Sequence, residues 1–364
     1  MQIKTLNLAN FRNYELLSVD FDEGVNIIYG DNAQGKTNIL ESIYMCSSGK
    51  SHKGSREKEI IRFGEEESHI KGEFSGICGN ERVDIHLKLN RGKGIAVNRI
   101  PIKKISDLYG KIKVVIFSAE DLDIIKRGPA ARRRFMDMEI CQLDPVYVED
   151  LISYNKIKNQ RAELFKEIER KEEKRTELLE TLDIWDLQLV NTGSRIIKRR
   201  RKFIYEINEI ILDIHYRITG GQEKIKLKYM PSVNEEDFYE EMLRNREKDL
   251  ITKTTNAGPH RDDFCFFEDK RNMKIYGSNG QQRTCALSLK LSEISMIEKI
   301  KKEKPVLLLD DVLSELDRNR QKHLLSGLRQ TQTIITCTGV DEFVENELGQ
   351  AKKFHIRDAR ITEE

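Results

Sequence analysis

The stretch GDNAQGKT, residues 30–37, constrains the fold of this chain more than any other part of the sequence. It fits the phosphate-binding pattern G-x-x-x-x-G-K-[ST], in which two glycines let backbone N–H groups approach phosphate oxygens at the start of a helix. The strand-like segment GVNIIY precedes it, and Ile39, Leu40 and Ile43 follow at helical spacing. We therefore expect a strand, a phosphate-binding loop and an amphipathic helix in succession.

The residues of this loop have separate expected roles. Lys36 is expected to reach the β- and γ-phosphates of ATP and so to take part in catalysis, and the hydroxyl of Thr37 is expected to hold Mg²⁺. ATP and Mg²⁺ are therefore the predicted cofactors. The remaining expected nucleotide contacts in the loop are Gly30, Asp31, Asn32, Ala33, Gln34, Gly35 and Asn38.

A second segment supplies the carboxylate that a phosphate-binding loop of this type needs. Residues 306–309 read VLLL, a continuous apolar run typical of a parallel strand buried on both faces, and Asp310 and Asp311 follow directly. Asp310 is the expected metal carboxylate, and Asp311 is the candidate that polarises the attacking water. Most ATPases with this arrangement have Glu at the second position. Because Asp is one methylene shorter, we expect slow hydrolysis.

The pattern of strand-like and helix-like segments divides the chain into three parts. Residues 1–125 read as short strands separated by turns, whereas residues from about 145 to 216 have almost no glycine or proline and carry apolar residues at i, i+3, i+4 spacing. From about residue 251 the α/β pattern returns, with a hairpin expected through FCFF and MKIY. We predict an α/β fold in which residues 1–125 and 251–364 form one ATPase lobe and residues 126–250 form an inserted, mainly helical arm. A helical bundle fits this arm as well as a coiled coil, because sustained heptads are few.

A second glycine-containing turn, GSNGQQ at residues 277–282, precedes a helical pattern but has no lysine. Ser278, Gly280 and Gln281 present a hydroxyl, a flexible backbone and a helix N-terminus, which together suit a γ-phosphate. Ser278 could also simply cap its own helix. The position of this turn, about thirty residues before Asp310, favours a signature motif that completes the nucleotide site of a second copy of the chain. We therefore predict a homodimer that encloses two ATP molecules.

Several motifs occur in one order along the chain, and together they point to a family. They are FRNY (11–14), GDNAQGKTN (30–38), SHK (51–53), FSAEDL (117–122), GPHRDD (258–263), GSNGQQRT (277–284) and LLLDDVLSELD (307–317). In this combination the chain resembles the RecF family, in the SMC-like branch of the ABC ATPase superfamily. Each short motif alone is unspecific, whereas the set is highly specific and spans nearly the whole chain.

The resemblance implies an ABC-type P-loop ATPase lobe and an ATP-gated homodimer that acts in recombinational DNA repair. It also implies binding to DNA at gaps or single-strand–double-strand junctions, slow hydrolysis stimulated by DNA, and support of RecA loading together with RecO and RecR. Whether duplex, single-stranded or gapped DNA is preferred stays open.

The resemblance also carries roles to particular residues of this sequence. Arg12 would be the phosphate-contacting arginine after the first strand, and residues 314–317 would form the loop that links the two sites of a dimer. Two departures stand out. Ala119 occupies a position where members of the family usually have proline, and Thr336 and Thr338 lie where transporter ATPases have a γ-phosphate-sensing histidine. The residue that senses the γ-phosphate is therefore open.

Basic residues in three places are candidates for contacts to DNA phosphates. The net charge of +2, from 63 Lys+Arg and 61 Asp+Glu, sets up no global field, so a nucleic-acid contact must come from local clusters. Such residues are commonly solvated or paired with nearby Glu, but residues 198–202 are consecutive cations without an acid. The candidates are Lys53, Arg56, Arg132, Arg133, Lys198, Arg199, Arg200 and Arg201.

Other features of the sequence exclude several classes of protein. His260-Arg261-Asp262 imitates a kinase catalytic loop, but Phe267 stands where the metal-binding Asn belongs, so a turn or domain contact is favoured over a metal site. The six cysteines form no C-x-x-C pair, which fits a reducing compartment and no structural zinc. The chain start lacks a signal peptide, and no apolar run approaches the ~18 residues of a membrane span. A cytoplasmic protein without a membrane partner is expected.

Two other functions stay open at this point. One is a non-hydrolysing scaffold on DNA in which ATP is structural, an alternative that Asp311 in place of Glu makes reasonable. The other is the nucleotide-binding subunit of a transporter. The charged insertion and the absence of an LSGGQ motif with a switch histidine argue against the transporter subunit.

Overall fold

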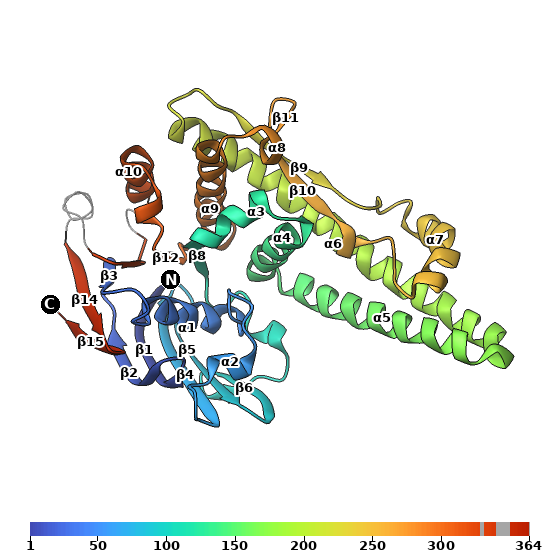
Figure 1. Cartoon of the computed structure of the whole chain (residues 1–364), viewed down its shortest axis with the longest axis horizontal. Helices are drawn as coiled ribbons and strands as arrows, with labels where there is room; N and C mark the ends of the chain where they lie inside the picture. Colours follow the sequence, from blue (N-terminus) through green and yellow to red (C-terminus); the bar gives the residue numbers. More distant parts are fainter. Residues whose placement is uncertain (328–330, 340–349, 364) are drawn as a thin grey trace. The chain divides into compact units, whose positions relative to one another are not determined.

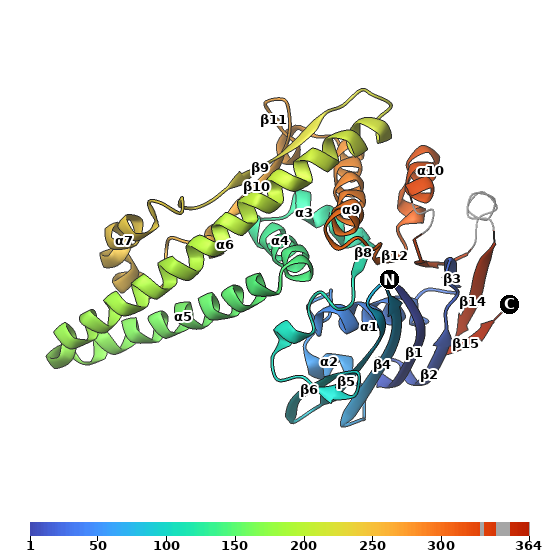
Figure 2. The same cartoon turned by 180° about the vertical axis from the view of Figure 1, so that it is seen from behind.

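The computed structural model describes residues 1–327, 331–339 and 350–363, and they group into two compact units. The first unit comprises Met1–Leu122, Arg217–Gly220 and Ala286–Glu364, and the second comprises Asp123–Tyr216 and Gly221–Cys285. Figures 1 and 2 show the chain from opposite sides. The first unit is therefore built from both ends of the chain, and it contains the phosphate-binding loop.

A mainly parallel sheet forms the centre of the first unit, in the order β15-β14-β3-β13-β12-β8. Strand β12 is buried along its whole length, as expected for the apolar run VLLL followed by Asp310. It pairs in parallel with β8 on one side and with β13 on the other, and β13 in turn pairs with β3. The strands are β3 (Val25–Tyr29), β8 (Val114–Ser118), β12 (Val306–Asp310), β13 (Thr333–Cys337), β14 (Ala351–Arg357) and β15 (Arg360–Glu363).

An antiparallel sheet forms the other layer of this unit, in the order β2-β1-β4-β5-β6-β7. Alternate residues of β4 and β5 are buried, so one face of the sheet packs against the core while the other stays accessible. In Figure 2 these strands lie side by side as a curved group. The strands are β1 (Gln2–Phe11), β2 (Tyr14–Asp20), β4 (Glu67–Gly76), β5 (Gly79–Lys88), β6 (Arg91–Val97) and β7 (Ile100–Pro101).

Helix α1 (Lys36–Ser48) lies between the two sheets and contacts strands of both. Its residues Ile39, Leu40 and Ile43 are fully buried, and residues on its other faces are buried as well. The helix therefore fixes the phosphate-binding loop rigidly to the core. The other helices and 3₁₀ turns of this unit are α2 (Glu57–Ile60), η1 (Ile105–Asp107), η2 (Ala119–Leu122), η5 (Leu313–Glu315) and α10 (Arg318–Gly327), together with most of α9 (Asn279–Lys301).

The second unit contains two long antiparallel helices, α5 (Pro145–Arg170) and α6 (Arg175–Ile218), which lie side by side in Figures 1 and 2. Near their connection Leu164, Phe165, Ile168 and Leu182 form a buried apolar cluster. The mainly helical character expected of the inserted arm matches this pair. The remaining elements are α3 (Asp123–Lys126), α4 (Pro129–Leu143), η3 (Glu172–Lys174), β9 (Ile225–Met230), α7 (Phe238–Thr252), η4 (Pro259–Arg261), β10 (Asp263–Glu268), β11 (Arg271–Asn272) and α8 (Met273–Tyr276).

The division into units differs from the expected boundary at residue 251. Residues 251–285 group with the helical arm, because β10 pairs along its length with β9 from the arm and with β11 in a short hairpin. The segment MKIY is the helix α8 and not the second strand of a hairpin, since the side chain of Asn272 accepts a hydrogen bond from the backbone N–H of Lys274 at 2.9 Å and so caps a helical turn. Among the described residues no helix has the length and apolar character that a membrane span requires.

Candidate functional site

The phosphate-binding loop requires its glycines for steric reasons. Gly30 follows directly after β3 with φ 150°, and Gly35 has φ 105°, a conformation that L side chains rarely adopt. A Cβ atom on Gly30 would collide with the carbonyl oxygen of Ile356, and one on Gly35 would lie 2.6 Å from Nδ2 of Asn13. The backbone conformation and the close approach of neighbouring segments therefore require both glycines, in addition to any requirement of a ligand.

The ammonium group of Lys36 lies inside the curve of the loop. It donates hydrogen bonds to the carbonyl oxygens of Gly30 at 2.7 Å and Asp31 at 2.8 Å, and the residue is only 4% exposed. A cation held at this point, with the N-terminus of α1 beside it, makes the loop a positively charged cradle. The cradle suits the phosphate groups of a nucleotide.

Thr37 and Asp310 are brought together although 273 positions separate them in the chain. The hydroxyl of Thr37 donates to Oδ1 of Asp310 at 2.7 Å, and the hydroxyl of Thr336, on the neighbouring strand β13, donates to the same oxygen at 2.8 Å. Hydroxyl and carboxylate oxygens are the ligands that Mg²⁺ prefers in proteins. The two residues expected to serve a metal thus lie in direct contact, and their donor set fits that ion.

Asp311 lies immediately beyond this pair, where the chain leaves β12. Its φ is 53°, an uncommon value for a residue with a side chain, and its backbone N–H donates to the hydroxyl of Thr336 at 3.1 Å. The pKa of Cys337 is raised to about 11 by burial and by the negative charge of Asp311. A carboxylate at this point stands at the carboxyl end of the parallel sheet, the side on which α/β proteins bind ligands.

Arg12, the expected phosphate contact, is held by other residues of the first unit. Its guanidinium group makes a bidentate pair with Glu41 at 2.9 and 2.7 Å, and it also donates to the hydroxyl of Ser55 at 2.6 Å and the carbonyl oxygen of Glu59 at 2.8 Å. Burial raises the pKa of Glu41, but the hydrogen bonds from Arg12 and Ser51 outweigh it and hold this pKa below its usual range. In this structure Arg12 connects β1 to α1.

Asn13 is a residue of the site that the sequence patterns did not single out. Its Nδ2 donates to the carbonyl oxygen of Gln34 at 3.0 Å, and its Oδ1 accepts from Nδ2 of Asn38 at 2.8 Å. On the other side of the loop, Oε1 of Gln34 accepts from the backbone N–H of Asp358 at 2.7 Å. The loop is thus held from both sheets. The motif FRNY around Asn13 was the available signal.

An open hollow of about 960 Å³ lies beside this loop in the first unit. Phe63 is fully exposed on its rim. The hollow is large enough for a base and a sugar. Its lining residues include Arg12, Asn13, Asn38, Lys58, Arg62 and Phe63.

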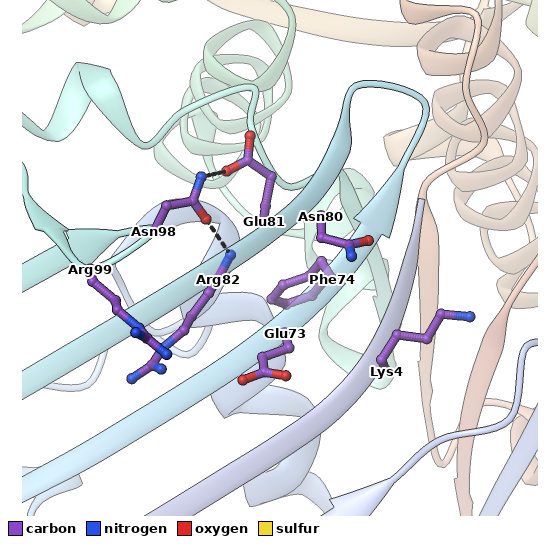
Figure 3. Close-up of a pocket in the computed structure, with 8 residues that line it drawn as sticks. All are labelled: Lys4, Glu73, Phe74, Asn80, Glu81, Arg82, Asn98 and Arg99. Atoms are coloured by element: carbon purple, nitrogen blue, oxygen red, sulfur yellow. Dashed lines mark hydrogen bonds between the residues drawn. The ribbon is translucent and has the colours of Figure 1, made fainter.

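A second hollow, of about 400 Å³, lies on the antiparallel sheet and is shown in Figure 3. The backbone N–H of Arg82 donates to Oδ1 of Asn98 at 2.8 Å, and Nδ2 of Asn98 donates to Glu81 at 2.8 Å. Arg82 also pairs with Asp84, and Lys4 pairs with Glu23. Lys4, Arg82 and Arg99 line this hollow together with Glu73 and Glu81, so it presents no single charge to a ligand, and we assign it no role.

The turn at Ser278 is exposed and forms a reciprocal helix cap. The backbone N–H of Gln281 donates to the hydroxyl of Ser278 at 3.2 Å, and the backbone N–H of Ser278 donates to Oε1 of Gln281 at 2.9 Å. Nε2 of Gln281 also donates to Glu223 at 3.0 Å. The capping role considered for Ser278 is therefore observed, and Gly280 lies in the first turn of α9.

The loop after β12 is held by its own backbone contacts. The hydroxyl of Ser314 donates to the carbonyl oxygen of Asp311 at 2.8 Å, and Asp317 accepts from the backbone N–H of Arg320 at 3.0 Å at the start of α10. Ser314 and Asp317 are exposed, so this segment is available to another molecule. Thr336 is buried against Asp310, whereas Thr338 is exposed.

His260 is a structural residue, in line with the turn expected there. Its Nε2 lies 2.9 Å from the carbonyl oxygen of Thr255 and so carries the proton, while Nδ1 accepts from the hydroxyl of Tyr154 at 2.7 Å. Burial, together with the nearby positive charges of Lys158 and Arg261, lowers the pKa of His260 to about 4.

Two of the expected DNA contacts are corrected by the structure. Arg132 is 3% exposed and makes a bidentate pair with Asp263, and Arg200 is 2% exposed among Asp137, Tyr147 and Asp262. Buried guanidinium groups with these partners cannot reach a phosphate of DNA. A run of consecutive cations on a helix must place some of them inward, since successive residues point about 100° apart.

The other basic candidates are accessible to different degrees. Lys53, Arg56 and Lys198 are exposed. Arg199 and Arg201 have 45% and 48% of their side chains exposed while pairing with Asp144 and Glu235. Arg133 is half-buried and donates to the carbonyl oxygen of Asp262 at 2.7 Å.

Comparison with known proteins identifies relatives over the full length of the chain. Residues 5–361 match the AAA domain family. The DNA replication and repair protein RecF of Lachnospira eligens is 55% identical over 364 residues, which is 100% of both chains.

Solved structures give the same result. A structure of the recombination mediator protein RecF with ATP, from the RecFOR pathway, matches with a TM-score of 0.92 and 36% identity and covers 100% of this chain and 97% of that one. An SMC head bound to the C-terminal winged-helix domain of ScpA matches with a TM-score of 0.58 at 15% identity, covering 100% of this chain and 98% of that one, which shows a shared fold.

Proposed function

The chain belongs to the RecF family of DNA replication and repair ATPases, and on this premise we propose that it is an ATP-gated clamp on DNA. In this proposal two copies enclose two molecules of ATP with Mg²⁺, bind DNA at gaps or single-strand–double-strand junctions, and release it after slow hydrolysis. RecO and RecR are the proposed partners, and the proposed outcome is support of RecA loading.

The observation that carries the proposal is the contact between Thr37 and Asp310, made at the mouth of the loop that holds Lys36. Mg²⁺ would be held by the hydroxyl of Thr37 and the carboxylate of Asp310, where it would neutralise charge on the phosphate oxygens. The loop residues 30–38 would surround the phosphates with backbone N–H groups. The hollow beside Asn13 and Asn38 would receive the base and sugar.

Asp311 is the proposed general base. Its backbone is held through Thr336, which also contacts Asp310, so the position of Asp311 is coupled to that of the metal carboxylate. A general base must come within hydrogen-bond reach of the attacking water, directly or through a second water. Because the side chain of Asp is shorter than that of Glu, the carboxylate of Asp311 would lie farther from the attacking water. The proposed turnover is therefore slow.

The exposed turn at Ser278 supports a role for the second copy. A helix N-terminus with a capping hydroxyl and no lysine attracts an anion but cannot by itself hold a triphosphate. Ile275 and Tyr276, just before this turn, have 68% and 70% of their surface exposed, and large exposed apolar residues beside a polar turn are typical of a surface that another protein covers. We assign Ser278, Gly280 and Gln281 to the nucleotide held by the partner copy.

The proposed DNA contacts are the accessible basic residues Lys53, Arg56, Lys198, Arg199 and Arg201, together with the half-buried Arg133. These residues would contact phosphates and not bases, so affinity should fall steeply with salt.

The test is ATP turnover by the purified chain alone, with duplex DNA, with single-stranded DNA and with gapped DNA, each at two salt concentrations. We expect slow turnover that rises with DNA and is lost in Asp311→Asn, while that variant still binds ATP. ATP-dependent DNA binding without turnover in the wild type would instead establish a non-hydrolysing scaffold. Turnover that is indifferent to every DNA would contradict the DNA clamp. Binding of purified RecR and RecO, with and without ATP, tests the partners.

A further inference from the structure

Two neighbouring strands of the antiparallel sheet bring Glu67, His69 and His86 together on their accessible face. Glu67 and His69 are two positions apart on β4, and side chains two apart in a strand lie on the same face. His86 of β5 is directly opposite His69, and Lys88 is directly opposite Glu67. The register of the β4–β5 pair therefore brings these side chains together, although those on different strands are at least 17 positions apart in the sequence.

The side chains converge on one point with their ligating atoms. Nε2 of His86 lies 2.9 Å from one carboxylate oxygen of Glu67, and Nε2 of His69 lies 4.0 Å from the other. The two imidazole rings stack with their centroids 3.8 Å apart and an interplanar angle of 24°. Among the described residues this is the group of His, Cys, Asp and Glu side chains whose ligand atoms all lie within 4.8 Å of one another.

From this geometry we propose that Glu67, His69 and His86 bind a borderline divalent cation, Zn²⁺ foremost. Zinc accepts imidazole nitrogen and carboxylate oxygen at about 2.0–2.2 Å, and ligand atoms around a tetrahedral ion are then about 3.4 Å apart. The observed separations of 2.9 and 4.0 Å bracket this value, so small side-chain rotations suffice. Water completes the coordination, because the side chains of Glu67 and His69 are half exposed and that of His86 is one third exposed.

Lys88 is the group that competes with the cation. Its Nζ lies 3.5 Å from the carboxylate of Glu67, which is a long distance for an ion pair. Both side chains are accessible to water. An exposed ion pair of this kind contributes little to stability. A cation bound by three ligands displaces it readily.

This site and the phosphate-binding loop select different ions. Thr37 and Asp310 offer oxygen alone, which suits Mg²⁺, whereas two imidazoles and one carboxylate favour Zn²⁺, Ni²⁺ or Cu²⁺. The cysteine spacing, which argued against structural zinc, does not bear on it, because no cysteine takes part. This metal site is independent of the proposed function, and a measurement of metal binding alone tests it.

The test is calorimetric titration of ZnCl₂ into the metal-free, nucleotide-free full chain. We expect one Zn²⁺ per chain, with binding that Mg²⁺ in excess does not remove. His69→Ala and His86→Ala should each weaken Zn²⁺ binding by about 10- to 100-fold, because removing a ligand costs at least as much as removing a group that orients one. All three positions face solvent, so the variants should fold, which circular dichroism checks.

Two control variants separate this site from other Zn²⁺ binders in the chain. His323→Ala removes a histidine of α10, and Cys78→Ser removes an exposed thiol at the turn between β4 and β5. Neither change should alter the affinity. If the wild type binds no Zn²⁺, or if Cys78→Ser abolishes binding while His69→Ala and His86→Ala retain it, the inference is wrong. As a second readout, Zn²⁺ should raise the thermal unfolding temperature of the wild type but not that of the double His variant.

Discussion

Replacement of Arg200 by Met tests whether this arginine stabilises the second unit instead of contacting DNA. Its guanidinium donates to Asp137 at 2.8 Å, to the hydroxyl of Tyr147 at 3.0 Å, to the carbonyl oxygen of Pro259 at 2.6 Å and to Asp262 at 3.0 Å. Methionine fills much of the same volume without charge. The change therefore removes the cation and leaves its acids in place.

The loss in unfolding free energy depends on the hydrogen bonds and solvation that Asp137 and Asp262 retain without Arg200. Asp262 is fully buried, and without Arg200 it keeps hydrogen bonds from the hydroxyl of Tyr229 and the backbone N–H of Ser232. Asp137 is 22% exposed, so water partly solvates it. Removing one partner of a buried ion pair typically costs 3–5 kcal/mol, and because both acids keep some solvation or hydrogen bonding we expect the low end, about 3 kcal/mol.

The assay is urea unfolding followed by the fluorescence of Trp185. This is the single tryptophan of the chain, and it packs against the apolar cluster of α5 and α6, so it reports on the second unit. With a denaturant slope of about 2 kcal/mol/M, a loss of about 3 kcal/mol lowers the urea midpoint by about 1.5 M.

Arg199→Met is the matched control, one position along the same helix. Arg199 has 45% of its side chain exposed and pairs with Asp144, so its loss should cost less than about 1 kcal/mol. It should instead weaken DNA binding and reduce the slope of log affinity against log salt by about 1. A stable Arg200→Met variant with weakened DNA binding, or a strongly destabilised Arg199→Met variant, would refute the assignment of the two residues.

Three further predictions concern the nucleotide, the dimer and the pH dependence of stability. Lys36→Ala should abolish ATP binding, because it removes the cation from the phosphate cradle, as measured with a fluorescent ATP analogue. Ser278→Arg should leave nucleotide binding by the monomer intact and prevent ATP-dependent dimers, and dimers of this variant in light scattering would contradict the second-copy site. The neutral form of His260 is favoured in the folded state, where its pKa is about 4 against 6.5 in an unfolded chain. The unfolded chain therefore takes up a proton first as pH falls from 6.5 to 4, and stability of the second unit should drop by up to about 3 kcal/mol over that window. His260→Asn should flatten this pH dependence of stability in the Trp185 assay. An equally steep dependence in the variant would contradict its assignment to His260.

Features that depend on neighbours along the chain could be predicted from the amino-acid sequence. Gly30, Gly35, Lys36 and Thr37 lie within one short segment, so their spacing alone specifies a loop that opens a helix. The run before Asp310 specifies a strand buried on both faces, and the structure has that strand in the centre of the parallel sheet. Local periodicity likewise sufficed for the long helices of the arm.

Tertiary structure decided what depends on register and on helix rotation. Arg199 and Arg200 are adjacent arginines that the sequence does not distinguish. Only the packing of α6 turns Arg199 toward solvent and Arg200 into a cluster of acids. Residues 251–285 join the second unit because β10 pairs with a strand that lies before them in the chain. The pairing of His69 with His86 depends on the register of the β4–β5 hairpin, which the sequence patterns did not specify. The contact of Thr37 with Asp310, in contrast, was expected, because the two motifs that supply them serve one metal ion.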